Sequence, residues 1–297
     1  MRDRTGHTRS PPTPGAAERH GEAGHGNADR PGVAGPEVGT RLSAKEIHEN
    51  VFVTAVEELR RPVVSLFWSA IAAGLVIGWS FVAGGFLASV SSAPAKHAAA
   101  SAVYPLGFIL VIIGRNQLFT ENTLEPVIPM LEHRTMSTLR ALLRLWGLVL
   151  LGNLAGALIF SVLLAHTPMI SAAVYRELTT IGHDAVSGGF WLVFYRAIFA
   201  GWLIALTAWL VSATQMTGAQ IALIWLTTAP ISAFGFRHSI AGAVEAFFMA
   251  LGGHASWGTA IGGFLVPAVL GNIAGGVLFV ALINHGQVVA ERKERGG

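Results

Sequence analysis

The chain carries the stretch LGNLAGALIF at residues 151–160 and repeats it, 119 residues later, as LGNIAGGVLF at residues 270–279. Six of the ten positions are identical, and each copy has one amide side chain, Asn153 or Asn272, in an otherwise apolar run. Gly, Ala and Leu match easily by chance in apolar sequence, but two aligned Asn residues are harder to explain in that way. The match therefore predicts that the chain consists of two related halves.

The low content of charged residues determines the class of protein. Only 12% of the 297 residues are charged, about half of the ~25% typical of soluble domains, and residues 63–285 contain just 14 of them. A soluble fold of that length could not cover its surface with polar groups. A soluble enzyme is therefore excluded, and so is a nucleic-acid-binding protein, despite the net charge of +3.

Two further observations argue against an enzyme or a cofactor. Cysteine is absent, which excludes disulfides, thiolate catalysis and Cys-based metal sites. No nucleophile–base pair or metal-ligand constellation stands out elsewhere in the sequence. We expect neither catalysis nor a bound cofactor.

The two ends of the chain differ from its middle. Residues 1–42 are predicted to be a disordered cytoplasmic tail, because the first 40 positions hold ten charges and no Leu, Ile, Phe, Trp or Tyr and cannot offset their ordering entropy by burial. The tail contains His7, His20 and His25; a solvated segment is favoured over a metal-binding one. Residues 286–297 are predicted to be a cytoplasmic C-terminal tail.

Residues 43–61 are predicted to form a helix. Ser43 and Glu46 have the spacing of a capping box, and Pro62 ends the segment. Apolar residues recur at helical spacing, which favours an amphipathic helix on the cytoplasmic membrane face; a plain helical linker is an equal alternative.

Charge-free runs predict the membrane spans within residues 62–285. A helix needs about 20 apolar residues to cross the hydrocarbon core. Six spans are predicted, near residues 65–90, 99–120, 142–165, 189–213, 219–250 and 259–283. The second and fifth are each interrupted by a polar, Gly-containing stretch, GRNQLFTENT at 114–123 and GFRHS at 235–239. The fold class predicted is an all-α integral membrane protein of two three-helix repeats, inverted because three is odd.

Basic residues predict the orientation of these spans, since they are enriched in cytoplasmic loops. With the N-terminus inside, the opposite side holds only Lys96 and Arg176, and Arg196 is arguable because it lies inside the fourth span. The cytoplasmic side holds Arg41, Lys45, Arg60, Arg61, Arg134, Arg140, Arg144, Arg292, Lys293 and Arg295. Both termini are predicted to be cytoplasmic.

The interrupted helices are the predicted functional region. Broken helices at membrane depth occur only where protein or a wet cavity covers their backbone. Their half-helix N-termini carry partial positive charge and would favour an anion. Asn153 and Asn272 are candidates for binding the freed backbone, or for joining helices beside their small neighbours.

Ionisable residues within the spans mark the candidate path. His238 follows the second break, and a titratable group at that depth suggests a pathway or proton relay; a buried His satisfied by a carbonyl is the alternative. Five charged residues are predicted either to flank a pore or to hold the loops by ion pairing: Arg115, Glu121, Arg196, Arg237 and Glu245. Tryptophans near span starts, Trp146 among them, are interpreted as interfacial anchors.

Several motifs together resemble the formate/nitrite transporter family. LFTENT at 118–123 is similar to its ELFTSNT loop, GFRHSIA at 235–241 to its GFEHSIAN stretch, and residues 196–209 to its RGIxCNxLVCLAVW run. With the two Gly-Asn repeats, the resemblance covers about residues 45–285.

The resemblance implies an aquaporin-like six-helix protomer in the plasma (inner) membrane, assembled as a homopentamer with one pore per protomer. It implies passage of small inorganic or carboxylate anions of weak acids, together with protons. Thr120 and His238 would meet at the pore centre, where the His protonates the anion. The residues that would form the constrictions and the rest of the path are Leu118, Phe119, Phe108, Tyr104, Ile231 and Asn122.

Departures from the family pattern affect the substrate more than the fold. Gln117 replaces a Glu, Gly201 and Gly242 replace Asn residues, and Ala205 replaces a Cys. Two other functions remain open. One is a neutral-solute pore for water, glycerol or a gas, although neither break contains the Asn-Pro-Ala box of aquaporins. The other is a non-conducting membrane sensor or scaffold.

Overall fold

The computed structural model describes residues 42–295 of the chain. The tail predicted at residues 1–42 lies outside the described residues except for its last position. Within residues 42–295 all regular structure is helical. The elements are α1 (Ala44–Arg60), α2 (Val63–Ile77), α3 (Trp79–Val90), η1 (Ala93–Ala95), α4 (Lys96–Val103), α5 (Pro105–Ile113), η2 (Glu121–Thr123), α6 (Val127–His133), α7 (Met136–His166), α8 (Ala172–Val186), α9 (Gly189–Val211), α10 (Thr217–Ala233), α11 (Ser239–Leu251), η3 (Thr259–Leu265), α12 (Val266–Gly276), η4 (Val277–Leu282) and α13 (Ile283–Arg295).

The apolar helices identify a multi-pass membrane protein. Five helical stretches in the described part of the chain are long and apolar enough to span a bilayer: Val63–Val90, Ala93–Ile113, Met136–His166, Gly189–Val211 and Thr259–Ala290. Ser239–Leu251 is a shorter apolar helix. Many large apolar side chains, such as Leu151, Phe199 and Leu278, are exposed on these helices. A surface of this kind is stable only against lipid or another protein chain.

Two of the predicted spans need correction. The predicted 99–120 span ends as a helix at Ile113, and the chain resumes only as the 3-10 turn η2 and the short helix α6. The predicted 219–250 span is two helices, α10 and α11, separated by residues 234–238. The polar stretches were correctly predicted as breaks, but the first one extends further than its sequence pattern indicates.

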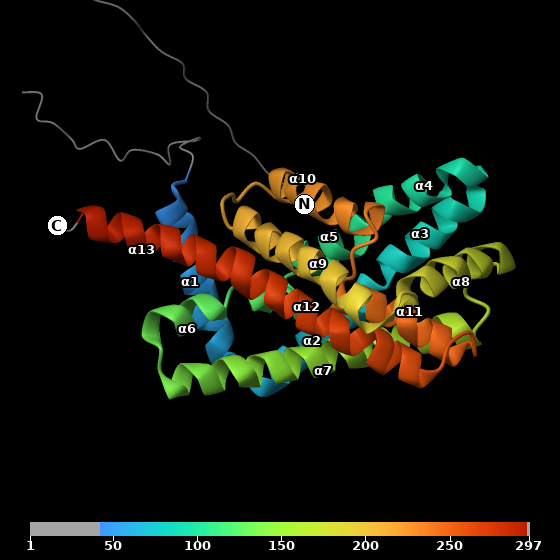
Figure 1. Cartoon of the computed structure of the whole chain (residues 1–297), viewed down its shortest axis with the longest axis horizontal. Coiled ribbons are helices and arrows are strands. Elements are labelled where there is room, and N and C mark those ends of the chain that lie inside the picture. Colours follow the sequence, from blue (N-terminus) through green and yellow to red (C-terminus); the bar gives the residue numbers. More distant parts are fainter. Residues whose placement is uncertain (1–41, 296–297) are drawn as a thin grey trace, which may run out of the picture. The chain divides into compact units, whose positions relative to one another are not determined.

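Two helix pairs of the same design form the centre of the fold. The helix α7, which carries Asn153, packs along α2, and α12, which carries Asn272, packs along α9. Figure 1 shows α7 in green and α12 in red running lengthwise through the helical region. At Gly74 of α2 a Cβ would collide with the carbonyl oxygen of Asn153, and at Gly201 of α9 with that of Asn272. Glycine therefore permits both close backbone approaches.

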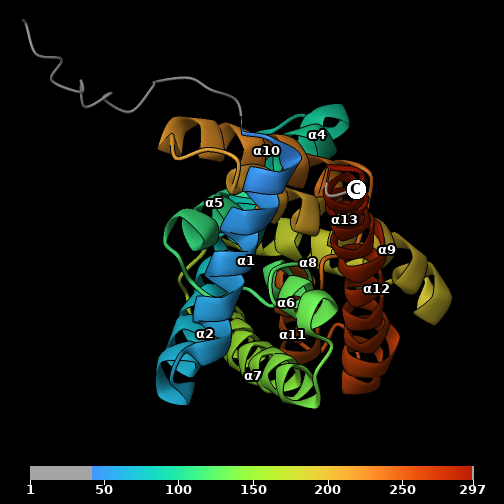
Figure 2. The same cartoon turned by 90° about the vertical axis from the view of Figure 1, so that its left-hand side faces the viewer.

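The helix α1 packs against protein. Ser43 and Glu46 form the predicted capping box, in which Glu46 Oε2 accepts from Ser43 N–H at 2.7 Å and Ser43 Oγ from Glu46 N–H at 3.3 Å. His48, Val51 and Ala55 form its buried face. Figure 2 shows that α1, α6 and α13 gather at one end of the described region. The position of α1 relative to a membrane surface stays a prediction.

An additional helix, α8, which the sequence analysis did not predict, connects the third and fourth predicted spans. Ser171 Oγ caps its start by accepting from Val174 N–H at 3.3 Å. Val174, Leu178 and Ala185 are buried against α3 and α11. Its polar face carries Glu177 and Asp184, which contribute to the site described next.

Candidate functional site

The first break is held by the side chain of Asn153. The helix α5 ends at Ile113, and Arg115 adopts a left-handed conformation with φ 55°. Asn153 Oδ1 accepts from Phe119 N–H at 2.8 Å, and its Nδ2 donates to Gln117 O and to Ala70 O, each at 2.8 Å. Two of these bonds satisfy backbone groups on either side of Leu118. No helical hydrogen bond satisfies these groups, because they lie in the break.

The second break has the same arrangement around Asn272. Its Oδ1 accepts from Ser239 N–H at 2.7 Å, and its Nδ2 donates to Arg237 O at 3.0 Å and to Ala197 O at 2.8 Å. Gly235, with φ 65°, makes the turn after α10. In both breaks one Asn side chain thus accepts from a backbone N–H and donates to the carbonyl two residues earlier. It also donates to a carbonyl of the helix that packs beside its own helix.

The two breaks meet at Thr120 and His238. Thr120 Oγ1 lies 2.8 Å from His238 Nε2, and the two residues are 0% and 2% exposed. His238 also caps α11, because its Nδ1 accepts from Ala241 N–H at 3.1 Å. A neutral ring that accepts at Nδ1 carries its hydrogen on Nε2, so it donates to Thr120 and leaves the hydroxyl hydrogen of Thr120 for another acceptor.

Apolar side chains surround this pair. The ring of Phe108 meets the His238 ring edge-on at 4.9 Å between centroids, and Tyr104 lies 5.3 Å beyond Phe108. The other apolar residues predicted on the path, Leu118, Phe119 and Ile231, are also buried. Asn122, predicted on the path as well, donates from Nδ2 to Gln117 Oε1 at 3.2 Å.

Trp146 has a role that its sequence position did not indicate. We expected an interfacial anchor, but its indole N–H donates to Asn122 O at 2.7 Å, and its ring lies edge-on to Phe119, 6.1 Å between centroids. The bond satisfies another backbone carbonyl of the first break. Only the packing of α7 against this loop brings the two residues together.

His238 lines a cavity of about 240 Å³, which we call the His238 cavity. Basic and acidic side chains reach it from α4, α8, α11 and the second break. The lining includes Lys96, Glu177, Asp184, Arg237 and Glu245, with Tyr104 and Phe264 beside His238. Glu177 and Asp184 were missed by the sequence analysis because α8 was not predicted.

Arg237 is the most buried of the charged residues in the His238 cavity, at 6% exposed. Its guanidinium donates to Asp184 Oδ2 from both terminal nitrogens at 3.2 Å and to Asp184 O at 2.7 Å. Ion pairing was one of its two predicted roles, and this pair ties the second break to α8. Its Nε is buried without a hydrogen-bond partner among the described residues.

Residues on either side of Thr120 line a second cavity, of about 140 Å³, which we call the Arg115 cavity. Its charged lining residues are Arg115, Glu58, Glu121 and Glu125, with Gln117 among the polar ones. Burial raises the pKa of Glu58 in α1, although hydrogen bonding and charge from Arg61 oppose the change. Arg196 lines neither cavity and lies beside the second break, where its carbonyl accepts from Arg237 N–H at 3.4 Å.

Three of the departures noted in the sequence have a local explanation. A Cβ at Gly201 would collide with the Asn272 backbone, and one at Gly242 with the ring of Phe264. Gln117 takes part in the first break through Asn122. Nothing in the structure explains the exchange at Ala205.

Comparison with known proteins places this geometry in a family. The family described as Formate/nitrite transporter matches residues 45–286. Inner membrane protein YfdC of Escherichia coli (strain K12) is 37% identical over 246 residues, covering 82% of this chain and 79% of YfdC.

Solved structures share the fold. An FNT family ion channel superposes with a TM-score of 0.72 at 20% identity, covering 82% of this chain and 98% of that one. A pentameric formate channel with formate bound superposes with a TM-score of 0.63 at 23% identity, covering 76% and 98%. The resemblance seen in the motifs is confirmed: this chain, a transport protein and not an enzyme, belongs to the formate/nitrite transporter family.

Proposed function

We propose that the chain forms a pore in the plasma (inner) membrane through which small monovalent anions of weak acids, such as formate or nitrite, pass together with protons. The observation that carries the proposal is the buried Thr120–His238 pair, formed where two broken helices meet. His238 opens to one cavity, and Gln117 and Glu121, close to Thr120 in sequence, open to another. Family membership supports the substrate class.

We also propose six membrane crossings in two inverted halves, each broken in its middle crossing. The matched hydrogen bonds of Asn153 and Asn272 support this reading. The excess of basic residues on one side supports cytoplasmic termini. A homopentamer is proposed because the formate channel of the same fold is pentameric and because apolar side chains such as Trp202 and Leu226 are exposed on the single chain.

Arg237 and the start of α11 would attract the anion. The partial positive charge of a helix N-terminus favours an anion, and an anion in the His238 cavity would give the unpaired Nε–H of Arg237 an acceptor. At the narrow point, the hydroxyl hydrogen of Thr120 is available to the anion.

The proton would pass through His238 only transiently. A second proton on the ring can go only to Nδ1, where it would displace the Ala241 N–H bond that caps α11. Losing such a cap costs about 1 kcal/mol. Because of this cost, the ring would be doubly protonated only while an anion lies beside it and stabilises the positive charge. It would then transfer the proton from Nε2 to the anion, directly or through Thr120, which leaves a neutral ring with its hydrogen on Nδ1. The resting ring would return when Nε2 takes up a proton and Nδ1 releases one, which restores the Ala241 bond. The neutral acid would cross the apolar region formed by Phe108 and Leu118 at little desolvation cost.

The acidic residues of both cavities favour a second candidate, a pore for neutral solutes. In the His238 cavity three acidic side chains face two basic ones, and in the Arg115 cavity three face one. Where these carboxyls are ionised, such linings would repel divalent anions and slow monovalent ones, whereas uncharged molecules would be unaffected.

Flux into proteoliposomes distinguishes these functions. Formate, nitrite, acetate, lactate and hydrosulfide would be tested at two pH values with an internal pH indicator, beside swelling with glycerol. We expect proton-linked anion uptake that collapses in His238→Ala and Thr120→Ala and persists in the control His183→Ala, which alters an exposed residue of α8. Unchanged uptake in both variants would exclude the mechanism, and glycerol swelling without anion uptake would support the neutral pore.

A further inference from the structure

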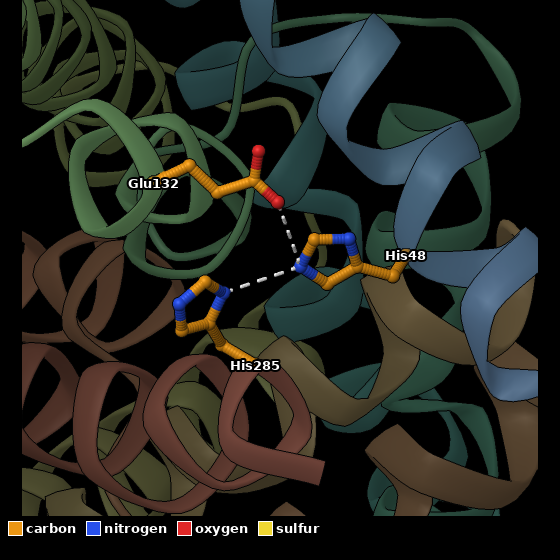
Figure 3. Close-up of side chains that lie close together, drawn as sticks. All are labelled: His48, Glu132 and His285. Carbon is orange, nitrogen blue, oxygen red and sulfur yellow. Dashed lines mark hydrogen bonds and ion pairs between the residues drawn. The ribbon is translucent and has the colours of Figure 1, made fainter. Parts of the chain in front are cut away.

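Three potential metal ligands converge where the first, sixth and last α-helices meet. His48 comes from α1, Glu132 from α6 and His285 from α13. Figure 3 shows the two imidazole rings and the carboxylate turned toward one another. We propose that His48, Glu132 and His285 form a binding site for a divalent transition-metal ion, with zinc as the best fit.

The separations agree with a shared ion. His48 Nε2 lies 3.4 Å from His285 Nδ1 and 3.8 Å from Glu132 Oε1, and the three ligand atoms all lie within 4.8 Å of one another. Zinc–nitrogen bonds of about 2.0–2.1 Å at tetrahedral angles place two ligand nitrogens about 3.3–3.4 Å apart. The His–His separation fits that value, and a small rotation of the Glu132 carboxylate would bring its oxygen closer.

The ligand types select the class of metal. Two imidazoles and one carboxylate suit zinc and its transition-metal neighbours, whereas Mg²⁺ and Ca²⁺ prefer all-oxygen sites. Three protein ligands leave one tetrahedral position for water. His48 is 1% exposed, but the Glu132 side chain is 21% exposed, so an ion can reach the site from solvent.

The surroundings hold His48 and orient His285. His48 is packed beside the edge of Trp209, with ring centroids 6.4 Å apart. His285 follows the π-helical segment η4, which changes the angular position of the residues after it relative to a continuous α-helix. π-Helical segments are frequent at functional sites.

A bound ion would fasten elements that border the Arg115 cavity. Asn50, Thr54 and Glu58 of α1 line that cavity, and α6 directly follows the first break. The metal would thus crosslink α1 to α6 and α13, which are distant in sequence. This inference does not depend on the proposed transport function.

Metal titration of the full chain tests the site. The protein would be purified without a polyhistidine tag, in a background where His7, His20 and His25 are replaced by Ala, and stripped with a chelator. Zn²⁺ would be titrated in competition with a chromophoric chelator, and Co²⁺ absorption would report the coordination geometry. We expect one equivalent per chain, tetrahedral Co²⁺ bands, no competition by Mg²⁺ and a Zn²⁺-dependent rise in the unfolding temperature.

Variants identify the ligands. Loss of an outer-shell partner already weakens metal binding about 10–100-fold, so Glu132→Gln and His285→Ala should each weaken it at least tenfold. His285→Cys should restore binding, because thiolate is a zinc ligand and the chain has no other cysteine. The control His254→Ala changes a histidine bonded to Tyr175 and should have no effect. Substoichiometric binding would overturn the proposal, and so would a Zn²⁺ affinity in Glu132→Gln and His285→Ala equal to that of the protein without these substitutions.

Discussion

Asn153 and Asn272 make the same three hydrogen bonds at two different helix breaks. Each accepts from one loop N–H and donates to a loop carbonyl two residues earlier and to a carbonyl on the helix packed beside its own. Both residues are 0% exposed. The sequence repeat therefore corresponds to a repeated structural device, in which one amide replaces the helical bonds that each break removes.

Removing either amide should destabilise the protein. Asn153→Ala and Asn272→Ala each leave buried backbone groups unsatisfied, at about 1–3 kcal/mol per group. We expect both variants to lose several degrees in unfolding temperature when the protein is heated in detergent, and to lose anion uptake. Asn116→Ala, in the first break, is the control for stability and should leave the unfolding temperature unchanged. An unchanged unfolding temperature in either Asn variant would contradict the role assigned to these side chains.

How much of the site could be predicted depended on the kind of signal. The polar, Gly-containing stretches and the repeated Asn residues are local patterns, so the breaks and the two amides could be found in the sequence. The pairing of Thr120 with His238 came from family resemblance alone. Asp184, Trp146 and the His48–Glu132–His285 cluster were missed, because their partners lie 24 to 237 residues away and no spacing records which faces of the helices meet.

Opposite charges in the His238 cavity should have opposite effects on uptake. Arg237→Gln removes a buried positive charge from this lining, and Glu245→Gln removes a partly buried carboxyl, which is negative at a pH high enough to ionise it. At an effective dielectric constant of about 20, a unit charge about 8 Å from the anion changes the anion's energy by about 2 kcal/mol, or about thirtyfold in affinity. Initial rates of formate uptake should show a higher KM in Arg237→Gln and a lower KM in Glu245→Gln. Equal shifts in one direction would mean that the cavity does not act on the anion electrostatically.

The carboxyl of Glu58 in the Arg115 cavity should make the rate of anion uptake depend on pH. Burial raises the pKa of this carboxyl, so it becomes neutral at a higher pH than an ordinary Glu and is ionised above its raised pKa. Glu58→Gln should therefore exceed the wild-type uptake rate at high pH, and the ratio should fall toward one as the pH drops through that pKa. The control is Glu57→Gln, at an exposed neighbouring position. A ratio that stays constant with pH would exclude a titrating Glu58.

Restoring a family residue at Gly201 should damage this chain. The family pattern that this chain resembles has Asn at this position. In this chain even a Cβ at Gly201 would collide with the backbone carbonyl of Asn272. That carbonyl cannot easily move, because it belongs to a packed helix. Gly201→Ala and Gly201→Asn should each cost about 1–3 kcal/mol of stability and pull α12 away from α9. Because Asn272 also holds the second break, uptake should fall in parallel.

Gly147 provides the matched control for that experiment. It lies within α7, and a Cβ there meets nothing within 4 Å, so Gly147→Ala should leave the fold intact and gain up to about 1 kcal/mol from helix propensity. Unfolding temperatures of the three variants in the same detergent give the comparison. If Gly201→Asn proved as stable as Gly147→Ala, the close approach of α9 and α12 would not be the reason why glycine stands here.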